Sequence, residues 1–118
     1  MKKKYNLTLI TLSKSQGGAS IAAERIRLNL RKKFKIQSIY SKNLGFFHSI
    51  KYIFAKLITK IFIRNELLLN SPNLFSKVNL KDVKGEIIFL NWIGEETISI
   101  DDLISTKKMI IWTIHDLW

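Results

Sequence analysis

Four short β-prone runs, separated by segments of helical character, constrain most strongly what this chain can fold into. The runs occupy residues 5–12, 35–40, 86–92 and 109–113. The last two are almost continuously apolar, which is typical of parallel strands buried on both faces. Helical spacing or capping signals fall between the runs, at residues 19–32, 45–69 and 99–105. The alternation predicts an α/β fold, a Rossmann-like parallel sheet with flanking helices.

The length and composition fit one domain with one core. The chain has 118 residues, of which 47% are hydrophobic, enough to fill a single core. Cysteine is absent, which excludes disulfides and thiolate metal sites and fits a reducing cytoplasm. With two histidines and no cysteine, we expect no metal site. Charged residues interrupt every apolar run before it is long enough to span a bilayer.

The positive charge is concentrated in the first half of the chain. The net charge is +11; residues 1–64 contain 15 Lys and Arg against the single acid Glu24, a net +14, whereas residues 65–118 contain 5 against 8, a net −3. Such asymmetry indicates an anionic partner, namely phosphates, a membrane surface or nucleic acid. A lysine-rich surface that only solubilises the chain is the alternative.

Residues 45–69 have the pattern of a basic amphipathic helix. Apolar side chains recur every three or four residues, at Phe47, Ile50, Phe54, Leu57, Ile58 and Ile61. A second set is cationic and comprises Lys51, Lys56, Lys60 and Arg64. Two interpretations are open: the helix lies on an anionic membrane, or its apolar side packs in the core while the basic side is solvated.

Gly17 and Gly18 lie between the first strand and the first helix. Glycine lets the backbone turn sharply there, and lets a phosphate approach the amides at the helix N-terminus. The dinucleotide pattern G-x-G-x-x-G and the Walker Lys are both missing, so neither NAD binding nor an ATPase is supported. A plain tight turn is the alternative.

His115 and Asp116 directly follow the last apolar run. Chemistry in open α/β sheets is found at the carboxyl edge of the strands. Adjacent residues of a strand point to opposite faces, so the two side chains cannot easily pair. His115 could act on a developing charge because its pKa lies near neutrality, or it could be structural. Trp92 and Trp118 follow strands and could stack on a sugar ring, whereas Trp112 lies inside its run and is expected in the core.

Three stretches together resemble the N-terminal domain of the family 4 glycosyltransferases, especially the bacterial members of colanic acid and capsule synthesis. They read SKSQGGASIAAERIRLNL, FLNWIGEETISIDDL and KMIIWTIHDLW. The resemblance implies a GT-B architecture, in which two Rossmann-like domains face a cleft. The first domain mainly holds the acceptor and the second the nucleotide-sugar donor. Transfer in this family retains the anomeric configuration and needs neither a metal nor a cofactor.

The resemblance also implies roles for individual residues. Gly17 and Gly18 match the glycine loop that approaches the donor diphosphate. His115 and Asp116 match the HD pair beside the cleft, which makes them the catalytic candidates, and Trp118 matches the aromatic residue that follows. Asn91 and Trp92 complete the expected substrate-binding set, although family members commonly have His in place of Asn91.

We expect residues 1–118 to be an incomplete acceptor-side domain. The donor domain with its paired glutamates is absent from the sequence, so we expect no transferase activity from these residues alone. Through that missing domain the enzyme would use a nucleotide-sugar donor. The acceptor would be a saccharide or a lipid-linked glycan, at the cytoplasmic side of an anionic inner membrane, with no nucleic acid involved.

Two other interpretations remain. One is a small basic module that binds membrane surfaces or nucleic acid, although the sequence has no RNP aromatics, KH loop or zinc ligands. The other is a non-functional remnant that folds poorly because an apolar face of its sheet is uncovered.

Overall fold

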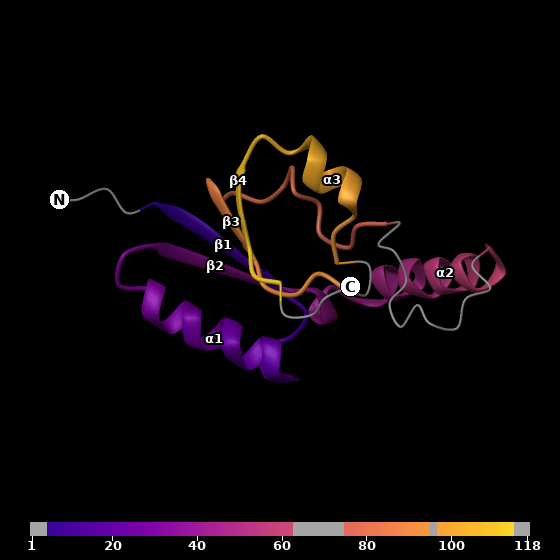
Figure 1. Ribbon diagram of the computed structural model, residues 1–118, viewed down its shortest axis with the longest axis horizontal. Coiled ribbons are helices and arrows are strands. Elements are labelled where there is room, and N and C mark those ends of the chain that lie inside the picture. Colours follow the sequence, from indigo (N-terminus) through magenta and orange to yellow (C-terminus); the bar gives the residue numbers. More distant parts are fainter. Residues whose placement is uncertain (1–4, 63–74, 95–96, 115–118) are drawn as a thin grey trace.

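A four-stranded, all-parallel sheet forms the centre of the structure, a computed structural model that describes residues 5–62, 75–94 and 97–114 (Figure 1). The strands are β1 (Asn6–Thr11), β2 (Lys35–Tyr40), β3 (Ile87–Leu90) and β4 (Met109–Trp112). The helices are α1 (Gly18–Leu30), the 3-10 turn η1 (Ser41–Asn43), α2 (Phe46–Phe62) and α3 (Ile100–Ser105). The α/β Rossmann-like fold expected from the sequence is confirmed.

The strands are ordered β2-β1-β3-β4 across the sheet. Leu7 of β1 lies opposite Ile36 of β2 on one side and Ile87 of β3 on the other. The chain therefore moves outward from β1 to β2, and then crosses back past β1 to form β3 and β4. Because all four strands are parallel, their carboxyl ends meet at one edge of the sheet.

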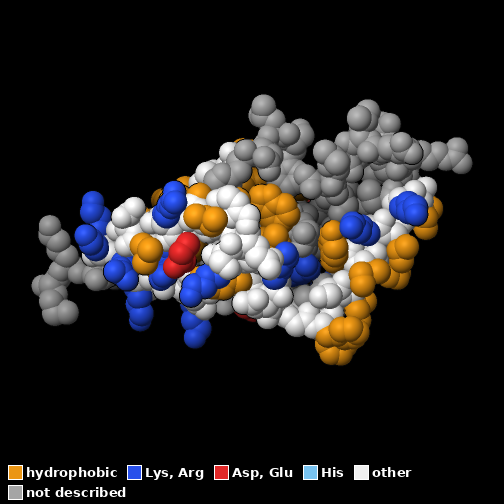
Figure 2. Space-filling model, turned by 90° about the horizontal axis from the view of Figure 1, so that it is seen from below, with side chains coloured by type: hydrophobic (Ala, Val, Ile, Leu, Met, Phe, Trp, Pro, Cys, Tyr) orange, Lys and Arg blue, Asp and Glu red, His pale blue; other side chains and the backbone are white. Residues whose placement is uncertain are grey.

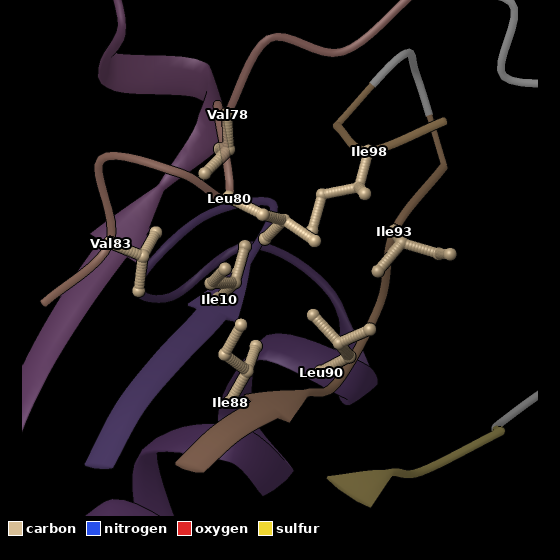
Figure 3. Packing of buried hydrophobic residues seen from close by; sticks show 8 residues of the cluster. All are labelled: Ile10, Val78, Leu80, Val83, Ile88, Leu90, Ile93 and Ile98. Atoms are coloured by element: carbon tan, nitrogen blue, oxygen red, sulfur yellow. The ribbon is translucent and has the colours of Figure 1, made fainter. Parts of the chain in front are cut away.

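The two central strands bury side chains on both faces, as their apolar composition predicts. Leu7 and Leu9 of β1 face α1, where they pack with Ala23 of that helix and Phe89 of β3. Successive side chains of a strand point to opposite faces. Residues of the alternate register therefore pack on the other face, in the cluster of Ile10, Val78, Leu80, Val83, Ile88, Leu90, Ile93 and Ile98 (Figure 3).

Different kinds of structure cover the two faces. α1 covers one face, and α3 lies on the opposite side of the sheet (Figure 1). On that second face most of the buried side chains come from residues outside the helices and strands, namely residues 78–83, Ile93 and Ile98, with Leu103 of α3 packed against them. The core is therefore completed largely by loops rather than by a second long helix.

α3 begins at the capping signal expected from the sequence. The Ser99 hydroxyl accepts a hydrogen bond from the Asp102 amide at 3.2 Å. Ser76 strengthens this start, because its hydroxyl accepts from the Ser99 amide at 2.7 Å and donates to the Asp102 carboxylate. These contacts fix the start of a helix of only six residues.

One expectation about burial is wrong, and one of the two interpretations of the amphipathic helix is contradicted. β4 is an edge strand rather than a buried one, with Met109 62% and Trp112 36% exposed, because it pairs on one side only and extends beyond the area that α1 covers. The apolar side of α2 does not pack in the core; Phe47, for example, is 81% exposed. Among the described residues, no helix is both long and apolar enough to cross a membrane.

Replacing Leu90 with Ala should lower the free energy of unfolding by about 2–5 kcal/mol, because Leu90 is fully buried and its removal leaves a cavity. Urea denaturation followed by circular dichroism measures the change. Ile104→Ala is the control, since Ile104 is 78% exposed on α3, and should change stability by no more than about 0.5 kcal/mol. Equal losses in the two variants would contradict the described core.

Candidate functional site at the carboxyl edge of the sheet

The connections that leave β1 and β3 diverge at the carboxyl edge. β1 leads into α1 on one face, whereas Ile93, Ile98 and α3, which follow β3, lie on the other. The two strands are neighbours in the sheet. Neighbouring strands whose connections leave to opposite faces form a topological switch point, where open α/β sheets bind their ligands.

The turn from β1 into α1 is held by a serine and a glycine. The Ser13 hydroxyl accepts from the Gln16 amide at 3.0 Å and lies 3.1 Å from the Ser20 hydroxyl. Gly17 caps α1 with φ 83° and ψ 159°, a conformation that essentially only glycine adopts. Gly17 thus makes the sharp turn expected from the sequence, and Gly18 is the first residue of α1.

The N-terminus of α1 is open to an anion. Gly17 has no side chain to cap the first turn, and no acid lies in that turn. Amides at the start of a helix have no intrahelical partner and hold partial positive charge. A Cβ at Gly17 or Gly18 would meet no atom within 4 Å, so there is open space beside this backbone. Both features suit a phosphate group.

Asn91 joins the end of β3 to the first turn of α1. Its side-chain amide donates to the Ala19 carbonyl at 2.5 Å, and its backbone amide donates to the Ile10 carbonyl at 3.1 Å. Asn91 is almost fully buried. It therefore has a positioning role that the sequence did not indicate; its expected contact with substrate stays a prediction.

Trp92 is half-buried beside Asn91. Its ring lies against Gly94, since a Cβ at Gly94 would come within 2.3 Å of the ring. The absence of a side chain at Gly94 therefore determines where the indole can sit. Stacking of Trp92 on a sugar stays a prediction.

The end of β2 adds polar residues that the sequence reasoning missed. The Lys42 side chain donates to the Gln16 side-chain oxygen at 2.8 Å, and its backbone amide donates to the Leu12 carbonyl at 2.9 Å. Ser41 and Thr97 are buried, with their hydroxyls 2.9 Å apart. A signal for them existed, because Ser41 and Lys42 directly follow a strand, as do Asn91 and Trp92.

The only acid in the first half of the chain is paired within α1. Glu24 accepts two hydrogen bonds from Arg27, at 2.8 and 2.5 Å. These hydrogen bonds, together with the positive charges of Arg27 and, to a lesser extent, Lys14, lower the pKa of the Glu24 carboxyl. The same hydrogen bonds and the negative charge of Glu24 raise the pKa of Arg27. Glu24 therefore pairs mainly with its own helix neighbour.

The catalytic candidates His115 and Asp116, together with Trp118, lie outside the described residues. The chain before them reaches the same edge, because the Thr113 amide donates to the Leu90 carbonyl of β3 at 2.9 Å. Their role at this edge stays a prediction. Across residues 5–62, 75–94 and 97–114, no group of three or more His, Cys, Asp or Glu could hold a metal ion.

Replacing Gly17 with Ala should lower the free energy of unfolding by about 1–3 kcal/mol, because the side chain strains the backbone at this positive φ. Gly18→Ala is the matched control: Gly18 is the first residue of α1 and has equal space around it. Ala favours helices, so this variant should be neutral or more stable by up to about 1 kcal/mol. Urea denaturation measures the free energy of unfolding of both variants. A larger loss of stability in Gly18→Ala than in Gly17→Ala would contradict the described turn.

Comparisons with known proteins do not assign this chain to a family. No family model, curated protein or solved structure matches it. Its function must therefore be inferred from its motifs and from the geometry of the carboxyl edge.

Proposed function

We propose that this chain is the acceptor-side domain of a retaining, nucleotide-sugar-dependent glycosyltransferase with GT-B architecture. The enzyme would extend a polysaccharide or a lipid-linked glycan. One observation supports this most: the Asn91–Ala19 hydrogen bond joins two of the family-like motifs across 72 positions of sequence. The motifs therefore meet at the switch point, where an α/β sheet binds ligands.

The start of α1 would help the sugar leave its nucleotide. Glycosyl transfer breaks the bond between the anomeric carbon and the donor diphosphate and forms a bond to the oxygen of an acceptor hydroxyl, whose proton passes to the departing diphosphate. Negative charge develops on the departing diphosphate. The amides at Gly17 and Gly18 and the positive end of α1 can stabilise that charge without moving.

The remaining residues would bind and orient the sugar. Trp92 offers an aromatic surface for a sugar ring at the end of β3. By the resemblance, His115 and Asp116 would contact the transferred sugar from the end of β4. The positive first half of the chain, net +14 in residues 1–64, favours an acceptor linked through a diphosphate.

Amide NMR titration tests the anion site at the start of α1. Inorganic diphosphate and uridine diphosphate, the kind of leaving group that a nucleotide-sugar donor releases, are added separately to the ¹⁵N-labelled chain. We expect saturable shifts at Gly17, Gly18 and Asn91 with both ligands, because the α1 amides bind the diphosphate that they share. Gly17→Ala should weaken binding roughly 10-fold, as the methyl group and strained turn displace the amides.

Gly45→Ala provides the matched control for this titration. Gly45 also has a positive φ, 86°, and open space around it, but it lies in the connection to α2 rather than at the β1–α1 turn. It should leave diphosphate affinity unchanged. Binding without shifts at Gly17 and Gly18 would contradict the proposal. Tight RNA binding with a steep salt dependence would instead support a nucleic-acid module.

A further inference from the structure

α2 presents an apolar surface away from the core. Its apolar face is formed by Phe47, Ile50, Ile53, Phe54, Leu57 and Ile61, all of them exposed. Phe47 is 81% and Ile61 70% exposed. The helix extends away from the sheet toward one end of the molecule (Figure 1). Figure 2 shows hydrophobic side chains gathered along this end, with Lys and Arg side chains beside them.

The apolar and the cationic residues of α2 lie on different sides of the helix axis. With about 100° between successive residues, the six apolar residues form one continuous stripe. Lys51 lies at one border of the stripe and Lys60 at the other. Lys56 lies beyond Lys60, with its ammonium 5.0 Å from the centre of the Tyr52 ring. The opposite side holds Tyr52 and Ala55, and Ala55 is fully buried.

A contact on that opposite side joins α2 to the body of the protein. The Lys77 ammonium lies 5.0 Å from the centre of the Tyr52 ring, and Lys77 is buried. Lys77 immediately precedes Val78, a member of the core cluster. Tyr52 and Ala55 therefore lie on the body side of the helix, and the apolar face is directed outward.

We infer that α2 binds an anionic membrane surface through its apolar face, lying in the plane of the interface. This inference does not depend on the proposed function. Apolar side chains on one face with lysines at its borders match both parts of such a surface: acyl chains receive the Phe, Ile and Leu side chains, and lipid phosphates attract the ammonium groups. α2 contains three lysines and no acid, so no charge on the helix opposes this contact.

The two other occupants of such a face fit less well. Nucleic acid would attract the lysines but offers no apolar phase for the isoleucines and leucine. A second copy of α2 would bury the apolar face, but would also bring six lysines together without an acid on either helix to pair with them. An anionic lipid surface offers acyl chains to the apolar side chains and phosphates to the lysines.

Binding in this mode would hold the carboxyl edge of the sheet close to the lipid. β2 ends at Tyr40, and α2 begins at Phe46 after the short turn η1. The edge and the helix are therefore neighbours along the chain. An acceptor anchored in the same membrane would reach this edge without leaving the lipid surface.

Vesicle sedimentation of the purified chain tests the inference. The vesicles consist of phosphatidylcholine alone or with about 30% phosphatidylglycerol, an anionic lipid. We expect binding to the anionic vesicles that weakens as salt is added. Replacing Lys51, Lys56 and Lys60 with Gln should weaken it roughly 100-fold, and Phe47→Ser with Phe54→Ser by about 10-fold or more.

Two matched control variants distinguish specific binding by the apolar face of α2 from effects of the total positive charge and from nonspecific hydrophobic adsorption. The first variant replaces Lys32, Lys33 and Lys35 with Gln. It removes the same amount of positive charge as the α2 variant, but from exposed positions at the opposite edge of the sheet, where β2 begins. Ile104→Ser with Met109→Ser removes exposed apolar groups from α3 and β4. Each should change vesicle binding by less than about 3-fold. The three lysines lie beyond the screened reach of the lipid charges, and Ile104 and Met109 are not part of the apolar face of α2.

Three outcomes would overturn the inference. The first is that the chain does not bind anionic vesicles. The second is that the α2 variants and the control variants lose vesicle binding equally. The third is that light scattering without vesicles shows a dimer, and that the two Phe substitutions dissociate it. All substituted positions are exposed, so unchanged amide spectra would show that folding is intact. If the chain binds vesicles but not diphosphate, only the proposed function is contradicted. If it binds diphosphate but not vesicles, only this inference is contradicted.

Discussion

Burial of both faces of β1 and β3 is the constraint on which the rest of this structure depends. Leu9, Ile10, Ile88 and Leu90 are essentially fully buried, and each such side chain contributes about 1.5–3 kcal/mol relative to exposure. Two neighbouring strands with apolar side chains on both faces must be covered twice. α1 covers one face, and residues 78–83, Ile93 and Ile98 cover most of the other. The apolar face of α2 takes no part in this cover, although Ala55 on the opposite side of α2 is fully buried.

The same constraint moves polar chemistry to the ends of the strands. Burial of a polar side chain without a partner is costly. Within β1 and β3 the buried polar side chains are limited to Thr8 and Thr11, whose hydroxyls have no hydrogen-bond partner among the described residues. The residues that follow the strands are polar instead, with Ser13 after β1, Ser41 after β2 and Asn91 after β3. At the carboxyl edge they are joined by hydrogen bonds between connections that are distant in sequence. The core and the candidate site thus result from one pattern.

Local sequence patterns were sufficient for most of the secondary structure. Apolar β-prone runs identified all four strands, the glycine pair identified the start of α1, and Ser99 with Asp102 identified the start of α3. Each of these signals acts over a few residues, within which propensity and capping are decided. The Asn91–Ala19 contact joins residues 72 positions apart, and no local pattern encodes such a pairing. The exposure of β4 was missed for a similar reason, because composition cannot tell an edge strand from a central one.

α2 shows where periodicity stops being informative. A stripe of apolar residues establishes that a helix has a face to cover, but the same stripe suits a protein core and a lipid surface. Two things distinguish them here: the core is already closed by loops, and lysines border the stripe on both sides. Because β2 leads through η1 into α2, whatever binds the apolar face also fixes how the carboxyl edge is presented. In the membrane-bound state that we infer, the lysines of α2 and the polar edge would belong to one surface.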